Sequence, residues 1–226
     1  MPKEKNVIIA KDLCLEYKKD VPIIKDSTFT IKSGSFVFIT GPSGSGKSTL
    51  LKSFYGELKP KSGILQIGGV SLNDIKSSKL AFLRKYLGII FQDYKLIKEW
   101  TVEKNVMLPL LIAGYSKNVC EAQTKRLLKH VRLSGKEHYY PLELSGGEQQ
   151  RVAMARALAH NPVIILADEP TGNLDEYSSR VIWGLLEGAN EQLGTTVVVV
   201  THSIPTNLKV PFKHLYIENG TVYEIS

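Results

Sequence analysis

Short apolar runs bounded by polar residues fill the first ninety residues. The runs within 7–32 are rich in β-branched residues, and they predict two or three strands there. A glycine pair at 68–69 predicts a turn after a later run. The strand-length runs of this part lie at residues 7–10, 13–17, 21–24, 29–31, Phe36–Thr40, 64–67 and 87–91.

The pattern then changes its period. From about Thr101 to His160 the strand pattern gives way to helical periodicity, punctuated by Pro109, Gly114, Gly135 and Pro141. Strands return at 163–167 and Thr196–Val200, with a helix between them at about Glu176–Leu193. Both runs are apolar throughout, which is typical of parallel strands buried on two faces. Residues 214–225 predict a hairpin around Asn219-Gly220.

One glycine-rich segment lies between a predicted strand and a predicted helix. Its glycines let backbone N–H groups curl around phosphate oxygens, and the helix start adds positive charge. Within it, Lys47 can reach the β/γ oxygens of a triphosphate, and the Ser48 hydroxyl can bind Mg²⁺. Strand, loop and helix together predict a nucleoside triphosphate site. The segment reads Gly41, Pro42, Ser43, Gly44, Ser45, Gly46, Lys47, Ser48 and Thr49.

Two further segments carry chemistry. The apolar run 163–167 ends in Asp168 and Glu169. Asp168 suits the Mg²⁺ shell, and Glu169 can activate the attacking water. Residues Ser145, Gly146, Gly147 and Glu148 precede a strongly helical run. Ser145 can cap that helix, which predicts a second anion site without its own lysine. Two such helix starts suggest that two molecules share two nucleotides.

Length and composition limit the remaining possibilities. The 226 residues are 43% hydrophobic, enough for one α/β domain, which we place at 1–226 with an inserted helical subdomain at about 95–160. No stretch approaches the ~18 apolar residues of a membrane span. The charged N-terminus lacks a signal-peptide core, which predicts a cytoplasmic protein. We expect Cys14 and Cys120 to be reduced.

The formal charge of +7 is unevenly distributed. Residues 1–132 hold 23 Lys and Arg against 11 Asp and Glu, and the remainder holds 6 against 11. The basic part suits phosphates, nucleic acid or an anionic membrane, or it is an ordinary solvated surface. No basic run exceeds two residues and no aromatic residues alternate with it, which supports the solvated surface as well as an anionic partner. We expect no nucleic-acid partner.

Taken in order, these motifs resemble those of the ATP-binding-cassette (ABC) ATPases over essentially the whole chain. The resemblance implies a P-loop NTPase core, α/β in class, with antiparallel N-terminal strands and an inserted helical subdomain. It also implies Mg²⁺-dependent hydrolysis of ATP by a homodimer, in which each signature covers the other subunit's phosphates. The motifs are Tyr17, Gly41–Thr49, Gln92, Leu144–Gln149, Asp168-Glu169, Asn173-Leu174-Asp175 and His202.

The resemblance also implies a role for each matching residue. Tyr17 stacks on adenine, although a half-buried strand tyrosine is the alternative. Gln92 touches Mg²⁺ or the attacking water, so Ser48, Gln92 and Asp168 form the metal set. Ser145 and Gly147 contact the γ-phosphate in trans, Gly146 and Glu148 belong to the same nucleotide-binding segment, and Asp175 lines the dimer seam. His202 holds the γ-phosphate and the water beside Lys47 and the base Glu169.

One branch of the family is most similar, the one with the cell-division ATPase FtsE, the lipoprotein-releasing ATPase LolD and MacB-type exporters. Phe91-Gln92-Asp93, Ile112-Ala113-Gly114 and Gln149-Gln150 are most like FtsE, whereas Ser203 replaces the usual Asp. An integral membrane partner like FtsX is implied, docking near residues 100–115 on the cytoplasmic face of the bacterial inner membrane. The output would be control of peptidoglycan hydrolases.

One alternative stays open, a LolD/MacB-type exporter subunit for lipoprotein, peptide or drug, which shares the same motifs. A cassette ATPase acting on DNA or ribosomes usually carries two cassettes or a long coiled coil, and neither fits in 226 residues. The presence of both Glu169 and His202 argues against a non-hydrolysing nucleotide sensor.

Overall fold

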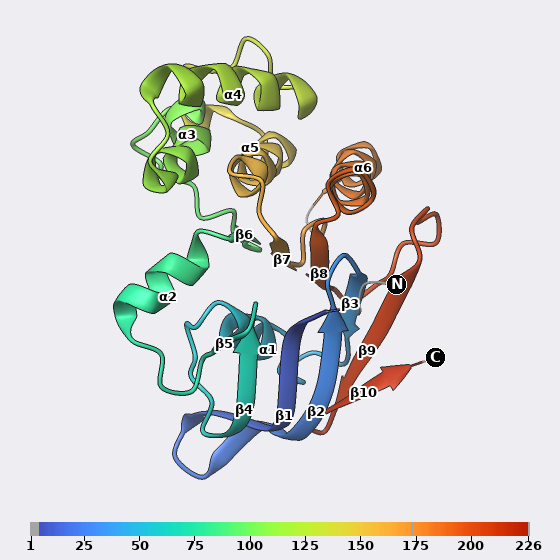
Figure 1. The fold of residues 1–226 in the computed structure, drawn as a ribbon. Coiled ribbons are helices and arrows are strands. Elements are labelled where there is room, and N and C mark those ends of the chain that lie inside the picture. Colours follow the sequence, from blue (N-terminus) through green and yellow to red (C-terminus); the bar gives the residue numbers. More distant parts are fainter. Residues whose placement is uncertain (1–4, 173, 226) are drawn as a thin grey trace.

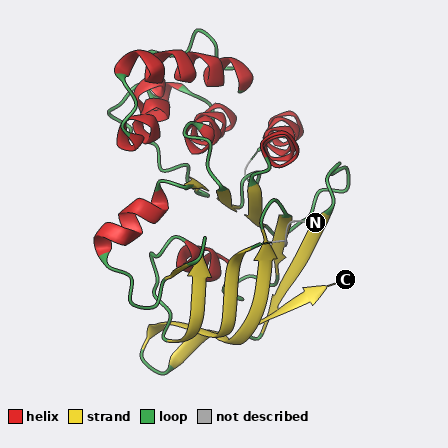
Figure 2. Cartoon of the chain, in the orientation of Figure 1, coloured by secondary structure: helices red, strands yellow, loops and turns green. Residues whose placement is uncertain are grey.

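Two sheets and a group of helices build the molecule, a computed structural model that describes residues 5–172 and 174–225 (Figures 1 and 2). The predicted Asn173 lies outside the described residues. One sheet is antiparallel, in the order β2-β1-β4-β5, and the other has the order β10-β9-β3-β8-β7-β6. The antiparallel strands are β1 (Asn6–Lys18), β2 (Val21–Lys32), β4 (Ser62–Ile67) and β5 (Val70–Ser71).

The antiparallel sheet contains two strands within 7–32, where the sequence predicts two or three. The four apolar runs of that segment join into the long strands β1 and β2. Their register shifts several times, and Asp12 and Asp26 adopt positive φ angles of 47° and 40° where the strands bend. A bulge interrupts the alternation of side chains without ending the hydrogen-bonded ladder. Each bent strand therefore shows two separate apolar runs in its sequence.

The second sheet follows the predicted parallel core. β3 pairs in parallel with β8 and β9, and β7 pairs in parallel with β6 and β8. Every residue of β3 and β8 is buried, as expected for strands covered on both faces. The strands are β3 (Phe36–Thr40), β6 (Leu87–Ile90), β7 (Ile164–Asp168), β8 (Thr196–Val200), β9 (Phe212–Glu218) and β10 (Thr221–Ile225).

The last hairpin has the predicted turn. β9 and β10 pair antiparallel, and Thr221 faces Glu218 across the two-residue connection. Asn219 and Gly220 both have positive φ, 52° and 83°. This is the conformation that a two-residue hairpin turn requires and that Asn and Gly accept at low cost.

The helices fall into two groups. α1 (Lys47–Phe54) lies between the sheets, where its Leu50 and Phe54 join the core cluster that both sheets share. α2 (Ser77–Arg84), which the apolar pattern did not predict, precedes β6. α3 (Val102–Ala113), α4 (Lys117–His130) and α5 (Gly146–Leu158) gather beyond the parallel sheet, with α6 (Glu176–Leu193) beside them (Figure 1).

The helical group has its own core. Val106, Leu128 and Val152, from α3, α4 and α5, are fully buried in one cluster that does not include any strand residue. Pro109 lies inside α3 instead of ending it, and Gly114 ends that helix in the left-handed conformation at φ 92°. The extent of the inserted subdomain, about 95–160, stays a prediction.

Candidate functional site

The glycine-rich loop between β3 and α1 holds its conformation through close backbone approaches. Gly41 has φ 150°, and a Cβ there would lie 2.3 Å from the carbonyl oxygen of Ile217. Only glycine fits that position, which sets the loop against β9. Gly46, the N-cap of α1, adopts φ 103°, and no side chain caps the helix. The first N–H groups of α1 therefore remain available to a phosphate.

Lys47 fills the centre of this loop. Its side chain is buried, and its Nζ donates hydrogen bonds to the carbonyl oxygens of Gly41 at 2.9 Å and Pro42 at 3.0 Å. These contacts hold the ammonium inside the curve of the loop, where an incoming phosphate chain would meet it. Ser45 lies in the same curve, and its Oγ is buried without a hydrogen-bond partner.

Next to the loop, the structure brings together the predicted metal set. The Ser48 hydroxyl donates to Asp168 Oδ1 at 3.1 Å, and both side chains line one pocket of about 380 Å³ with Gln92. Burial raises the pKa of Asp168, while the Ser48 hydrogen bond and Lys52, Lys47 and His202 lower it. No described residue of the signature 144–149 lines this pocket.

The residues of this pocket suit Mg²⁺ chemically. A hydroxyl, a carboxylate and an amide oxygen are the hard oxygen ligands that Mg²⁺ prefers. Within the described ranges, no group of three His, Cys, Asp or Glu residues forms a cluster that could hold a metal on its own. Nucleotide-bound Mg²⁺ needs only one or two protein ligands, because phosphate and water supply the rest.

Glu169 has an unusual backbone and an available carboxylate. Its φ is 46°, an uncommon value for a non-glycine residue, and its N–H donates to Val200 O at 2.9 Å. Its Oε1 is buried without a hydrogen bond, although it lies 3.2 Å from Nε2 of His202, at ion-pair distance. The Glu169 side chain is only 13% exposed, whereas that of His202 is 59% exposed.

Tyr17 extends from the end of β1 and is 56% exposed. Because Tyr17 belongs to a strand and is about half exposed, both the adenine-stacking role and the alternative of a half-buried strand tyrosine stay open. The hydrogen bond to Glu57 is the main cause that raises the pKa of Lys52 on α1, and Tyr17 adds to it.

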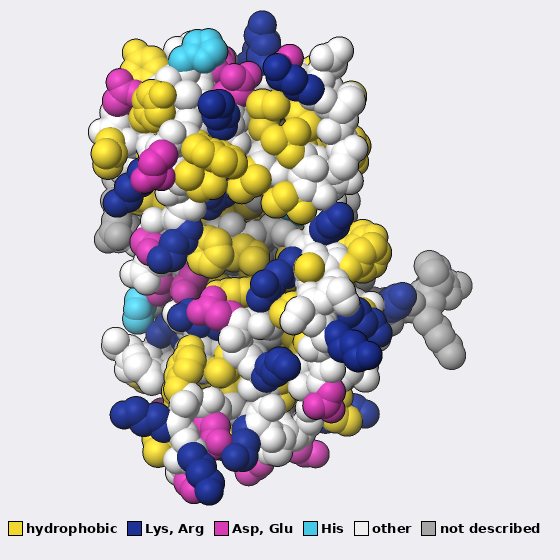
Figure 3. Space-filling view, turned by 90° about the vertical axis from the view of Figure 1, so that its left-hand side faces the viewer, with side chains coloured by type: hydrophobic (Ala, Val, Ile, Leu, Met, Phe, Trp, Pro, Cys, Tyr) yellow, Lys and Arg dark blue, Asp and Glu magenta, His cyan; other side chains and the backbone are white. Residues whose placement is uncertain are grey.

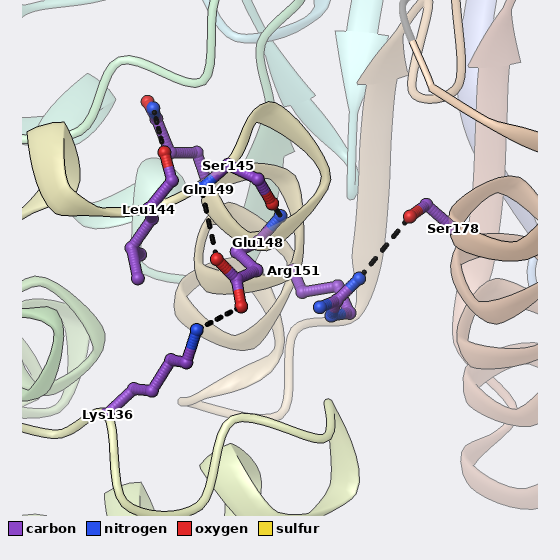
Figure 4. Close-up of polar contacts among 7 residues, drawn as sticks. All are labelled: Lys136, Leu144, Ser145, Glu148, Gln149, Arg151 and Ser178. Atoms are coloured by element: carbon purple, nitrogen blue, oxygen red, sulfur yellow. Dashed lines mark hydrogen bonds and ion pairs between the residues drawn. The ribbon is translucent and has the colours of Figure 1, made fainter.

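The signature segment begins α5 at a different place. Ser145 is the N-cap, its Oγ accepts from Glu148 N at 3.3 Å, and Glu148 Oε2 accepts from Ser145 N at 3.0 Å (Figure 4). This reciprocal pair is a capping box. Gly147 lies tightly on α6, since an added Cβ would be 2.6 Å from Ser178 Oγ.

Asp175 begins α6 by the same device. Its carboxylate accepts from Ser178 N at 2.8 Å and from Ser178 Oγ at 2.8 Å. The Ser178 N–H is the main cause that lowers the pKa of Asp175. Arg151 of α5 donates to the same Ser178 hydroxyl at 3.5 Å, which connects the signature helix to Asp175 (Figure 4).

Two residues of α5 without a predicted role connect the signature helix to the nucleotide pocket. Gln150, buried on α5, donates to Pro170 O at 2.7 Å, beside Glu169. Arg156 donates to Tyr94 O at 2.6 Å and Lys95 O at 2.7 Å, and burial lowers its pKa to about 10. The signature helix is thus attached to both loops that carry Gln92 and Glu169. The doubled Gln149-Gln150 was the one sequence signal for any of these contacts.

Asn105 of α3 completes these connections. Fully buried, it accepts from Ile97 N at 2.8 Å and donates to Ile97 O, Trp100 O and Thr101 O. The segment after Gln92 is therefore fixed to α3 at one end and to α5 at the other.

Comparison with known proteins identifies the family. The profile described as "ABC transporter" matches residues 24–172. The cell division ATP-binding protein FtsE of Streptococcus pneumoniae is 38% identical over 217 residues, 96% of this chain and 94% of that protein. FtsE of Escherichia coli is 41% identical over 87% of this chain and 88% of that protein.

A second group of relatives is equally similar. The methionine import ATP-binding protein MetN 2 of Bacillus licheniformis is 42% identical over 91% of this chain, which spans 60% of that protein. Among solved structures, the ATP-binding cassette MJ0796, a dimer bound to ADP and Pi, superposes with a TM-score of 0.89 at 38% identity. The match covers 97% of this chain and 98% of that one. The chain belongs to the ABC transporter family, and it is an ABC ATPase.

Proposed function

We propose that the chain is the ATP-hydrolysing subunit of an FtsE-type membrane complex, and that two copies close over two ATP molecules. The observation that carries the proposal is the separation of the two anion sites within one chain. Ser48, Asp168 and Gln92 line one pocket beside the loop that holds Lys47, and the signature contributes no described residue to this pocket. A second copy supplies what each pocket lacks.

Within one subunit, the phosphate loop binds ATP before the copies meet. The N–H groups of α1 and the Lys47 ammonium face the β- and γ-phosphates, and the exposed Tyr17 ring stacks on the adenine. Ser48, Asp168 and Gln92 would hold Mg²⁺, which when bound neutralises phosphate charge and orients the γ-phosphoryl group.

Hydrolysis itself needs a base beside the γ-phosphate. Glu169 is the base in our proposal, because its buried Oε1 accepts no hydrogen bond and can take a proton from water. As the water oxygen bonds to phosphorus, the bond to the ADP oxygen breaks, and the proton passes to Glu169. His202, at ion-pair distance from Glu169, orients that water and the γ-phosphate. The positive φ of Glu169 fits a strained catalytic position.

The signature completes the site from the second copy. Ser145 and Gly146 are exposed at the N-terminus of α5, where helix N–H groups attract an anion. Asp175 lies at the adjacent start of α6, connected through Ser178 and Arg151, and is placed to line the seam. The ADP- and Pi-bound dimer of MJ0796 supports this arrangement.

Complementation between two inactive variants tests the shared site. Lys47→Ala removes the cation of the phosphate loop, and Ser145→Arg blocks the signature. In a mixed dimer one site carries both changes and the other carries neither, so we expect ATPase activity to return to as much as about half of the wild-type value. Each variant alone, at the same total concentration, is the control. Mixed dimers that form and remain inactive would contradict action in trans.

The membrane partner is the finer part of the proposal. Within the described residues, no helix combines the length and the apolar character that crossing a bilayer requires. A groove of about 320 Å³ lies between α2, β6, α3 and α5, and it is lined by Leu108, Pro109 and Ile112 among others. Apolar side chains gather on this face, as Figure 3 shows. We propose that a helix of an FtsX-like membrane subunit docks there.

The groove falls within the segment 100–115 that the resemblance implies for docking. Leu108, Pro109 and Ile112 of α3 line it. Leu96, which precedes α3, is partly buried against the core of α3, α4 and α5. His160 lines the same groove, and burial lowers the pKa of its imidazole.

The choice between systems rests on motifs and relatives. Phe91-Gln92-Asp93, Ile112-Ala113-Gly114 and the FtsE relatives favour a cell-division complex that controls peptidoglycan hydrolases. The MetN relatives, 39–42% identical, make a methionine importer the second candidate. Identification of the membrane protein that co-purifies with the chain separates the two.

A further inference from the structure

Glu148, the acidic residue of the signature, has partners on both of its carboxylate oxygens. Lys136, from the segment between α4 and α5, extends its ammonium to Glu148 Oε1 in an ion pair (Figure 4). The other carboxylate oxygen, Oε2, accepts from Ser145 N at 3.0 Å. Lys136, Glu148 and Ser145 thus form a chain of contacts that ends at the signature serine.

A carboxylate at this position presents an electrostatic problem. The N-terminus of α5 is where the proposed function places the γ-phosphate of the second copy's ATP, and like charges repel. The Glu148 side chain is only 19% exposed, so water screens its charge poorly. The hydrogen bond from Lys136 is the main cause that lowers the pKa of Glu148 below its usual range, so this carboxylate is charged at neutral pH and needs a counter-charge.

Lys136 is the cation placed to offset that charge. Its side chain is 34% exposed, and the Tyr139 ring lies 5.6 Å from its Nζ, which restricts the ammonium further. Arg151, one turn along α5, points instead toward Ser178 (Figure 4). The signature therefore depends on a lysine outside its own motif for charge balance.

We propose that Lys136 is a positioning residue for ATP hydrolysis: it neutralises Glu148 and fixes its rotamer, so that Ser145 meets the second copy's γ-phosphate without repulsion. The Ser145 oxygen accepts from Glu148 N, which leaves the hydroxyl proton to donate to phosphate. The inference deepens the proposed function and rests on it, since the phosphate in question belongs to another subunit.

Charge variants of the pair test the proposal through dimerisation. In a Glu169→Gln background, which retains ATP, Lys136→Met should raise the dissociation constant of the ATP-bound dimer about tenfold. Lys136→Arg should restore it, since it keeps the cation. ATP affinity of the monomer, measured by calorimetry, should stay within about twofold of the parent, because the phosphate loop is untouched. Lys125→Met, an exposed lysine of α4, is the matched control and should change neither value.

The double variant separates charge balance from a structural role. With Glu148→Gln present, no charge remains to be offset, so adding Lys136→Met should cost less than about twofold in dimer affinity. An equal loss in both backgrounds overturns the proposal, as does a Lys136→Met dimer as tight as the parent. Ser145→Arg in the same assay separates a failure of the Lys136 proposal from a failure of the proposed function. If this variant also dimerises normally, the site is not shared between subunits.

Discussion

Two helix starts, those of α1 and α5, face anions in our proposal, and the chain builds them differently. The first turn of α1 is left open, because its N-cap is Gly46 and no side chain accepts from its N–H groups. The first turn of α5 is closed by the capping box of Ser145 and Glu148. An open start must be completed by a ligand, whereas a capped start is stable without one.

Their surroundings differ in the same direction. The open start has the buried Lys47 beside it, and the Ser48 hydroxyl of α1 donates to Asp168 at the end of β7. The capped start is exposed at Ser145, and beside it the positive charge of Lys136 offsets the negative charge of Glu148. These differences fit our proposal, in which α1 captures ATP and α5 recognises ATP already captured by another subunit.

The most damaging change tests the chemistry that both starts serve. Glu169→Gln keeps the shape of the side chain and removes the base, so turnover should fall by roughly 100-fold or more. ATP binding should survive, because the loop around Gly41 and Lys47 is unchanged, and ATP-bound dimers should accumulate. Steady-state ATPase assays and size-exclusion chromatography measure the two effects. Near-normal turnover of the purified variant would remove Glu169 from its role.

A smaller change separates the two starts directly. Lys47→Ala should weaken ATP binding to the monomer about tenfold or more, because the loop N–H groups alone offset the phosphate charge poorly. Ser145→Arg should leave that binding within about twofold and abolish the ATP-dependent dimer. Calorimetry on each monomer gives the comparison. Equal losses of monomer affinity would mean that both starts act on one ATP within one chain.

The sequence predicts most of the core because its strands are buried on both faces. Thr196–Val200 and Phe36–Thr40 are apolar throughout, and the glycine loop marks the helix that follows. Two strands lie within 7–32, the lower of the predicted counts, and each contains two apolar runs because Asp12 and Asp26 bend the strands without ending them. α2 was missed because its Leu83 is its only buried residue, which leaves little periodicity to detect.

The candidate site is predictable where its motifs are local. The loop Gly41–Thr49, Asp168 with Glu169, and the signature each lie in one short segment, and the structure places Ser48, Gln92 and Asp168 around one pocket. Their metal and catalytic roles stay predictions. Contacts between distant segments could not be read from sequence: Arg156 holds a loop 61 residues earlier, and Gln150 reaches Pro170. Both contacts join a side chain to a distant backbone carbonyl, and such contacts leave no regular spacing of residue types in the sequence.

The last prediction concerns the groove where the regions that carry α1 and α5 meet. Ile112 lines this groove and is 55% exposed, so replacing it by Glu should harm docking while leaving the fold intact. We expect about fivefold less salt-resistant membrane binding for Ile112→Glu, because burying a charge against an apolar helix is costly. Leu142→Glu, more exposed and outside the groove, is the matched control. Leu142→Glu therefore shows whether any added charge has the same effect.

Attraction of the basic residues to anionic lipid should disappear at high salt, unlike docking to the partner. Fractionation at low and high salt, with and without the membrane partner gene, measures both. Salt-resistant binding that survives loss of the partner would mean that the chain contacts the bilayer itself.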